Sequence, residues 1–449
     1  MAANYVLLER IELNASAASI SFTNIPQSGY TDLKLVFSAR DDNSAVYNNM
    51  LLTFNGSTTG YSERVLGGTG SAAFSSSQSA SSLQYQYINS ANSTANSFSN
   101  GEFYIPNYTS SNNKSVSVDN VQENNATSAV VGLAAQLWSN SAAITTIKLE
   151  PASSKLFQAN STFSLYGLAA VGTTPAIAPK ASGGNRIDYD GTYWIHTFTT
   201  TGTFVPTQGL TCDALVVAGG GAGGTGQSGG QDAGGGGAGG FRTGTGLSLA
   251  TATSYTVTVG AGGAASTVDY ARGGNGTNSS LSTISSTGGG GGGGASGANA
   301  SQTGGSGGGG AINQPGAAGN AGSYSPVEGY AGGAGFGTSQ AAGGGGGGSS
   351  AVGVTSTVAG VAGAGGAGTA NSYSGSSVTY AGGGGGGADV TGGAGGTGGG
   401  GAGSSAGSTN SVAGTTNTGG GGGGGSAGSN PRQLGSNGGS GIVIIRYLA

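Results

Sequence analysis

Glycine constrains this chain more than any other residue type. The 449 residues include 101 glycines. Nearly all of them follow residue 180, where glycine makes up about a third of the chain, a collagen-like proportion. Collagen also needs abundant proline and a strict three-residue repeat, but the chain has 9 prolines and no such repeat. The sequence therefore excludes a collagen triple helix.

The end of the chain argues that the glycine-rich region is folded. Disordered segments usually combine high net charge with few aromatic residues, whereas this chain has a formal net charge of -4 and 7% aromatic residues. The region ends in "GIVIIRYLA", an apolar strand pattern. Similar patterns open it, in "YWIHTFTTTGTFVPT" and "CDALVVAGGG". We expect Ile442 to Ile445 to return to the strands near residues 193–217, so that the glycine segment folds back on itself.

Polyglycine II helices are the regular structure that such a segment favours. Glycine is a poor α-helix former and has no side chain to bury. The polyproline II conformation has three residues per turn and no internal hydrogen bonds, so its amide groups need partners on neighbouring runs. Only glycine lets the backbones approach closely enough. The longest runs lie at residues 234–237, 288–294, 307–310, 343–348, 382–387, 398–401 and 419–425.

The first part of the chain predicts a different all-β structure. Short apolar runs alternate with turn residues, as in "TDLKLVFSAR", and Asn55-Gly56 is a tight-turn signal. Two polar stretches, 68–100 and 107–127, predict solvated loops, with a partner-binding surface as the alternative. The fold class is thus mainly β, with a jelly-roll-like β-sandwich and a small strand base that carries a polyglycine II bundle. We place the sandwich at residues 1–172, a linker at 173–186 and the glycine-rich domain at 187–449.

Catalytic and cofactor signals are weak. One cysteine, Cys212, and one histidine, His196, exclude a disulfide framework and a Cys/His metal cluster, and we expect both residues to be structural. "GAGGTG" after "LVVA" matches a phosphate loop, but no βαβ unit follows it. The scattered Asp and Glu residues single out no glycosidase pair, and the scattered Lys and Arg form no patch for nucleic acid. We expect no enzyme activity and no cofactor. The chain also shows neither a membrane-length apolar run nor a signal-peptide pattern.

Large side chains inside the glycine-rich loops are the candidate site residues. Tyr and Arg are enriched at binding hot spots, but the same residues can instead cover the flanks of the bundle or its strand base. Counting runs forward from the first one puts Tyr373 and Tyr380 at the far end, whereas counting backward from the last strand puts Tyr324 and Arg432 there. The candidates for receptor contact are Tyr270, Arg272, Tyr324, Tyr330, Tyr373, Tyr380 and Arg432.

Both parts of the chain resemble phage proteins. "ISFTNIPQSGYTDLKLVFSAR", "LLTFNGSTTGYSER" and "FSLYGL" are similar to a jelly-roll-like domain in tail and virion proteins of marine phages. "YWIHTFTTTGTF", "LVVAGGGAGG", "SYTVTVGAGG" and "GSGIVIIRY", in that order, resemble the glycine-rich domain of phage tail-fibre adhesins. The second resemblance implies a fibre-tip domain whose loops touch the host receptor, and a trimer.

These observations lead to one hypothesis and three alternatives. The hypothesis is a tail-fibre adhesin of a tailed phage, located in the virion. Its sandwich binds other virion or tail proteins, and its bundle binds a bacterial surface protein or glycan. A capsid decoration or structural spike protein would have the same fold but no receptor-binding role. A polysaccharide depolymerase would need catalytic residues, and an ice-binding protein would need a flat repetitive Thr or Ala face.

Overall fold

The chain forms two compact units built from β-strands and extended glycine runs. The computed structural model describes residues 5–125, 129–169, 178–226, 231–295, 299–337, 340–405, 410–427 and 434–449. One unit contains residues 1–179, 185–194 and 449, and the other contains residues 180–184 and 195–448. The only helical element in the described ranges is a short 3-10 turn, η1 (Ala152–Ser154). The mainly β fold class is confirmed, and the sheets are open.

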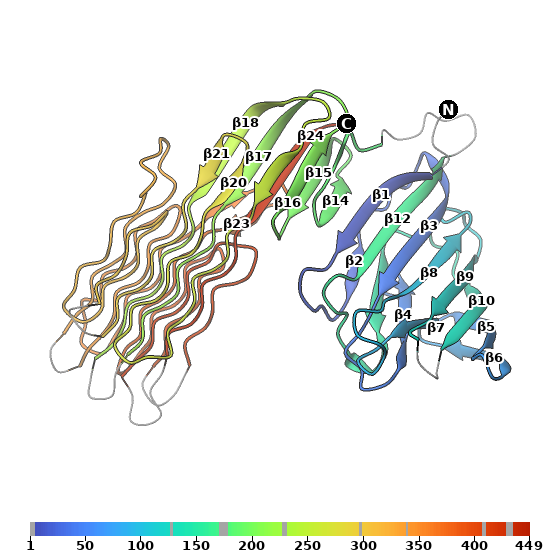
Figure 1. Cartoon of the computed structure of the whole chain (residues 1–449), viewed down its shortest axis with the longest axis horizontal. Helices are drawn as coiled ribbons and strands as arrows, with labels where there is room; N and C mark the ends of the chain where they lie inside the picture. The colour runs from blue at the N-terminus through green and yellow to red at the C-terminus, as the bar shows by residue number, and fades with distance from the viewer. Residues whose placement is uncertain are drawn as a thin grey trace. The chain divides into compact units, whose positions relative to one another are not determined.

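The first unit contains two antiparallel sheets (Figure 1). Its strands are β1 (Tyr5–Glu12), β2 (Ile20–Phe22), β3 (Tyr30–Ala39), β4 (Tyr47–Phe54), β5 (Tyr61–Gly68), β6 (Ala73–Ala80), β7 (Leu83–Asn89), β8 (Ser99–Ile105), β9 (Lys114–Gln122), β10 (Val130–Trp138), β11 (Ile147–Pro151), β12 (Thr162–Ala169) and β14 (Arg186–Tyr189). The larger sheet has the order β14-β1-β12-β3-β8-β9-β10-β5-β6 within this unit, and the smaller has the order β2-β11-β4-β7.

One hydrophobic core lies between these two sheets. Leu35 and Phe103 of the larger sheet and Leu52 and Leu149 of the smaller sheet are all completely buried in it. Buried and more exposed residues alternate along the strands, so that every second residue of β9 and of β10 is buried. Alternation of this kind places one face of each sheet against the other. The predicted β-sandwich is therefore present.

The prediction of loops in the two polar stretches is wrong in part. Residues 68–100 contain β6 and β7, and residues 107–127 contain β9. Polar residues dominate β6 because both of its faces are largely exposed. In β7, by contrast, Leu83 and Ile88 are buried within an otherwise polar sequence. Composition alone therefore hid two edge strands, β6 and β7, and one interior strand, β9.

The end of the predicted linker also forms structure with the sandwich. β14 pairs with β1 through Arg10–Ile187 and Ile11–Arg186. The guanidinium of Arg186 lies 2.6 Å from a carboxylate oxygen of Glu9 and 2.6 Å from one of Asp188. Burial of Glu9 raises its carboxyl pKa to about 9, and the neighbouring Asp188 adds to the shift. These contacts attach the segment after residue 185 to the first unit.

Short strands form one end of the second unit. They are β13 (Ala181–Ser182), β15 (Tyr193–Phe198, from Ile195 on in this unit), β16 (Gly202–Pro206), β17 (Leu210–Val217), β18 (Phe241–Leu249), β19 (Tyr255–Thr258), β20 (Ser279–Leu281), β21 (Ile284–Ser286), β22 (Thr369–Asn371), β23 (Val378–Tyr380) and β24 (Ile442–Leu448). The orders are β18-β17-β24-β15 and β13-β16-β19-β20-β21, and β22 pairs with β23 as a hairpin. We call these strands the strand base.

The last strand returns to the strand base as predicted. β24 pairs antiparallel with β17, from Val217–Ile442 to Asp213–Arg446. Val443, Ile444 and Ile445 are completely buried. The two ends of the glycine-rich segment therefore meet in one sheet, and the residues between them form a closed excursion.

Extended runs leave the strand base and return to it side by side (Figure 1). Consecutive runs are antiparallel: along their hydrogen bonds, residue numbers increase in one run and decrease in the other. The outgoing runs are 218–226, 260–265, 287–295, 305–311, 329–336, 351–356, 381–388, 400–405 and 419–427. The returning runs are 232–240, 271–278, 299–304, 314–321, 341–348, 362–368, 391–397, 410–417 and 434–441. The turns therefore alternate between the strand base and what we call the far end.

The hydrogen bonds of these runs have a period of three residues. Run 218–226 shows the pattern, because its amides donate to three different neighbouring runs in rotation. The amides of residues 219, 222 and 225 donate to run 271–278, those of 220 and 223 to run 434–441, and those of 221 and 224 to run 232–240. Three residues per turn is the repeat of the polyproline II helix. The run thus has the lateral bonding that polyglycine II packing requires.

Close lateral contact explains why glycine fills the runs. A Cβ atom added to Gly221 would lie 2.3 Å from the carbonyl oxygen of Gly290, and one added to Gly236 would lie 2.1 Å from that of Gly221. No side chain fits at such separations unless the backbones move apart. The central runs, 218–226, 232–240, 341–348 and 419–427, are buried throughout. Glycine therefore supplies the closeness that satisfies buried amide groups.

Candidate functional site

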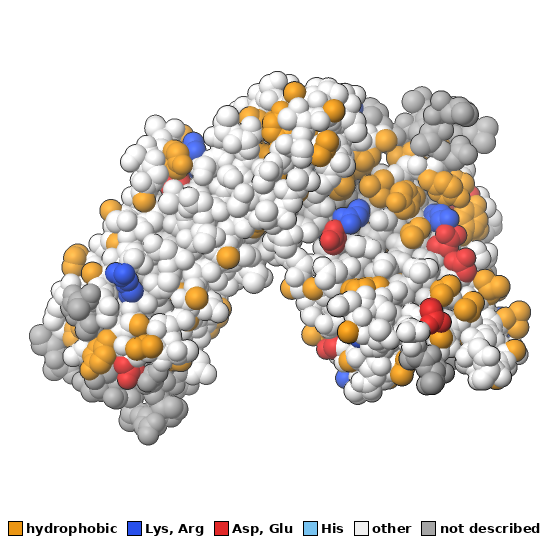
Figure 2. All heavy atoms as spheres, viewed as in Figure 1, with side chains coloured by type: hydrophobic (Ala, Val, Ile, Leu, Met, Phe, Trp, Pro, Cys, Tyr) orange, Lys and Arg blue, Asp and Glu red, His pale blue; other side chains and the backbone are white. Residues whose placement is uncertain are grey.

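The far end of the glycine bundle exposes a group of apolar side chains. Phe336, Val358, Val361 and Val390 lie at turns there and are all exposed. Figure 2 shows hydrophobic side chains gathered at this end of the molecule. Exposed apolar groups on a rigid support commonly mark interaction sites. We call these four residues the far-end patch.

Backbone bonds join the turns that carry the far-end patch. The carbonyl of Gly360 accepts hydrogen bonds from the amides of Val390 (3.1 Å) and Thr391 (2.9 Å). Single β-bridges link Phe336 to Ala342 and Val361 to Thr391. Beneath these turns, Ala342, Ala362 and Ala388 form a small buried cluster. The patch is therefore fixed by the same lateral contacts that hold the bundle.

Two carboxyl groups, one of them completely buried, accept hydrogen bonds from backbone amides near the far end. Asp232 is completely buried at the start of a returning run, where one of its carboxylate oxygens accepts a hydrogen bond from the amide of Ala427 at 2.5 Å. Burial, with a smaller contribution from nearby Asp389, raises its pKa to about 8. The carboxylate of Asp389 accepts from the amide of Ala341 at 3.1 Å. Both carboxyl groups hold backbone amides of adjacent runs, which is a structural role.

Tyr270 and Arg272 lie at the far end, as an exposed binding role requires. Tyr270 is half-buried and Arg272 is exposed. The backbone of Tyr270 has a φ of 58°, in the left-handed region, and its carbonyl accepts from the Asn299 side chain at 2.8 Å. This hydrogen bond places the Tyr270 turn against Asn299, the first residue of run 299–304. Arg432 lies outside the described residues.

Four of the predicted tyrosines lie at or near the strand base instead. Tyr324 stacks on the guanidinium of Arg242 at 3.8 Å, and Tyr373 stacks on that of Arg446 at 3.9 Å. Tyr330 is exposed on the flank, one residue into an outgoing run.

Tyr380 corrects the prediction most clearly. It is the last residue of β23 and is 3% exposed, whereas the prediction requires an exposed side chain at the far end. Both ways of counting runs fail, because they recognised only uninterrupted glycine. Runs such as 314–321, 351–356 and 410–417 contain Ala, Val, Thr or Asn and were missed. The covering role, the alternative for this set, describes Tyr324, Tyr373 and Tyr380.

The far-end patch itself was missed at the level of sequence. Hot-spot composition points to Tyr and Arg, whereas the patch consists of three valines and a phenylalanine. A signal was present in "TSTVAGVAG" and "ADVTGG", where branched side chains interrupt glycine and alanine. Such residues fit poorly in the interior of the array and are tolerated at its turns and at its margin.

The remaining sequence candidates have structural surroundings. His196 is completely buried, with Nδ1 2.7 Å from the Gly183 carbonyl and Nε2 3.0 Å from the Tyr447 hydroxyl. Burial lowers its pKa to about 4. The Tyr447 hydroxyl accepts from the Lys180 amide at 3.0 Å and so donates its proton to neutral His196. Cys212 is also buried, in β17.

The phosphate-loop and metal possibilities receive no support from the described residues. The amides of residues 221–224, within "GAGGTG", all donate to neighbouring runs, so they are not available to a phosphate. Among the described residues, no group of three or more His, Cys, Asp or Glu side chains is placed to hold a metal ion. Over the same ranges, no helix combines the length and the apolar character needed to cross a membrane.

Comparison with known proteins identifies the second unit. Residues 198–448 match the family described as a glycine-rich domain. The match covers more than half of the 449 residues, so the chain belongs to this family. No curated protein matches the chain.

Proposed function

We propose that this member of the glycine-rich domain family is a virion structural protein of a tailed phage, namely a tail-fibre adhesin. In this proposal the sandwich binds other virion or tail proteins. The far end of the glycine bundle binds a bacterial surface protein or glycan. The chain acts by binding alone, with neither catalysis nor a cofactor, and works as a homo-oligomer.

The observation that carries the proposal is the far-end patch on a cross-bonded array. Each run of the array is fixed by hydrogen bonds to several neighbours, as run 218–226 shows. Side chains held in this way lose less conformational entropy on binding than side chains on a mobile loop. The four apolar residues of the patch offer modest contact area, so affinity would come from several copies acting together.

Exchange of far-end turns tests the proposal. Residues 357–361 and 389–391 would be replaced by turns of equal length that lack Val358, Val361 and Val390, in phage particles that carry the protein. We expect adsorption to the host to fall at least tenfold, because the contact surface is lost while the runs remain. The matched control replaces residues 372–377, the turn between β22 and β23 at the strand base, and should leave adsorption unchanged.

Two results would contradict the proposal. Equal adsorption of particles that carry the far-end variant and the control variant would show that the far-end patch is not part of the binding site. Immunogold labelling that places the protein over the whole capsid surface would favour a decoration protein instead. Thermal unfolding of the purified variants must match that of the original protein, so that a folding defect is not mistaken for lost binding.

A further inference from the structure

The outer edge of the larger sandwich sheet is a regular and uncharged strand. β6 is the last strand of that sheet and pairs only with β5 among the described residues. Its register with β5 runs without a bulge from Tyr61–Ala80 to Gly68–Ala73. The sequence of β6, AFSSSQSA, has no charge and no proline. Soluble proteins normally protect edge strands with charges, prolines or bulges, and β6 has none of these.

The hydrophobic core is also incompletely closed beside β6. Three partly buried hydrophobic residues pack against the rim of the core, and two of them, Phe74 and Tyr85, lie at this edge. The Phe74 ring contacts the Tyr87 ring edge-on, with 6.4 Å between ring centroids. The Tyr85 hydroxyl donates to the Ser76 hydroxyl at 2.8 Å. A strand added beside β6 would cover this rim.

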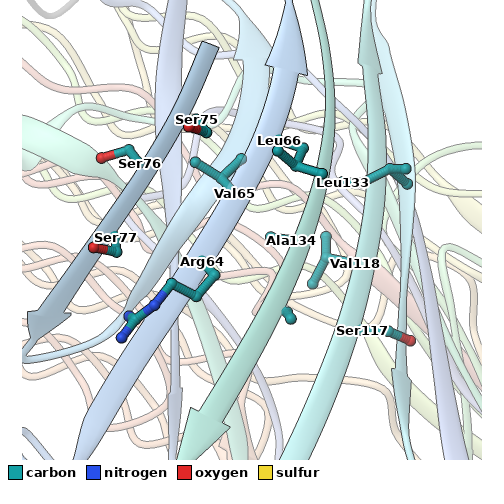
Figure 3. A pocket seen from close by; sticks show the side chains of 11 residues that line it. Arg64, Val65, Leu66, Ser75, Ser76, Ser77, Ser117, Val118, Leu133 and Ala134 are labelled. Carbon is teal, nitrogen blue, oxygen red and sulfur yellow. The ribbon is translucent and has the colours of Figure 1, made fainter.

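The outer face next to β6 is apolar and hollowed. Leu66 of β5 is 66% exposed, and Leu133 of β10 is 60% exposed. They form the floor of a shallow concavity of about 660 Å³. Figure 3 shows Ser75, Ser76 and Ser77 on the strand at one side of this floor and Ser117 at the other. The apolar surface therefore continues up to the edge strand, where small side chains leave the backbone accessible.

We propose that two copies of this chain associate by antiparallel pairing of their β6 strands across a two-fold axis. Each copy then presents the same strand to the other, which is the isologous geometry of most protein dimers. Continuation of one sheet through both copies requires residues of the same face to lie opposite each other. The axis therefore passes between the two copies of one residue at the middle of the strand, either Ser76 or Ser77.

Charge favours a second copy as the occupant. β6 carries no charged residue, so self-pairing places no like charges opposite each other. The nearest charged side chain on the outer face is Arg64, which is opposite Ser77 in the register with β5. In a dimer centred on Ser77, the two Arg64 positions lie three strand spacings apart, about 14 Å. That separation exceeds the Debye length of about 8 Å at physiological salt.

The interface would be small, and so the dimer would be weak. Main-chain hydrogen bonds and the covered rim at Phe74 and Tyr85 are its main contributions. We expect a dissociation constant of about 1 to 100 µM. Attachment of several copies to one particle raises their effective concentration and would make such pairing complete.

Sedimentation velocity of the full-length protein over that concentration range tests the proposal. We expect a monomer–dimer equilibrium that Ser77→Lys weakens at least tenfold, because two lysines would face each other near the axis. Ser117→Lys is the control: it adds the same charge to the same face on β9, away from the edge, and should leave the equilibrium unchanged. Both variants should melt at the temperature of the original protein.

Cysteine crosslinking provides a second measurement. Ser76→Cys and Ser77→Cys would be oxidised separately, and the residue on the two-fold axis should form a disulfide-linked dimer. Ser117→Cys should not crosslink, and Cys212 is buried. A monomer at the highest concentration, a trimer, an equilibrium insensitive to Ser77→Lys, or absence of both crosslinks would each overturn the proposal.

Discussion

Gly236 provides the sharpest test of the lateral bonding in the glycine bundle. It lies in the middle of run 232–240, where its amide donates to Gly422 and its carbonyl accepts from Gly384, both at 2.8 Å. The Cβ atom of Gly236→Ala would lie 2.1 Å from the Gly221 carbonyl oxygen. An ordinary contact needs about 3.5 Å, so the two runs must separate by about 1.4 Å.

This separation breaks specific hydrogen bonds. Runs 218–226 and 232–240 share the bonds from Gly221 to Gly237, at 2.8 Å, and from Gly224 to Gly234, at 3.0 Å. Lengthened by more than an ångström, neither remains a hydrogen bond. A buried amide left without a partner costs about 1–3 kcal/mol. We expect Gly236→Ala to lower the free energy of unfolding of the second unit by about 3–5 kcal/mol, against at most about 1 kcal/mol gained from a stiffer unfolded chain.

Differential scanning calorimetry with hydrogen exchange mass spectrometry measures this effect. A loss of this size lowers the melting temperature of the second unit by roughly 10 °C, and peptides from both runs should exchange faster. Gly209→Ala is the control, because a Cβ at Gly209 meets no atom within 4 Å, and it should change stability by less than about 0.5 kcal/mol. Equal melting temperatures for the two variants would refute close backbone packing as the reason for glycine.

Three further predictions concern polar side chains with structural roles. The single histidine, His196, should titrate near pH 4 by NMR, because burial lowers its pKa to about 4. The free energy of unfolding of the second unit should fall by about 3 kcal/mol as pH falls from 6.5 to 4. Titration of His196 near pH 6.5 would contradict its burial. Asp232 acts in the opposite direction: its raised pKa, about 8, means that stability declines as pH rises from about 4 to 8. Asp232→Asn should remove that part of the decline in thermal melts, and an unchanged pH profile would argue against it. Arg40 donates to the carbonyls of Thr94, at 2.8 Å, and Ser97, at 2.9 Å, so Arg40→Ala should speed amide exchange in residues 91–97 and cost about 1–3 kcal/mol; unchanged exchange there would contradict the tethering role.

The sequence was enough to predict that the last strand pairs with the strands at the start of the glycine-rich domain. Four consecutive apolar residues, Ile442 to Ile445, need a buried position, and glycine offers none. Strand patterns at residues 193–217 were the nearest partners, and β24 does pair with β17. The abundance of glycine also argued against an α-helix in this region, and the scarcity of proline excluded a collagen triple helix. The local physics of glycine was thus sufficient for the class of structure.

The direction of each turn depended on runs that the sequence did not reveal. Run 351–356 contains valine and threonine, yet it hydrogen-bonds to its neighbours like the glycine runs. Such a run lies at the margin of the array, where Val352 and Val354 point to solvent. One missed run moves every later turn to the opposite end. Tyr373 and Tyr380 were misplaced in this way.

The sequence is sufficient to show that the chain is built from strands and closely packed glycine, with both ends of the glycine segment in one sheet. Which side chains lie at the far end, and the position of the serine-rich strand β6 at an exposed edge, are visible only in the folded chain. The reason is physical. Glycine and serine carry little side-chain preference, so their places are set by hydrogen bonds to runs and strands far away in the chain.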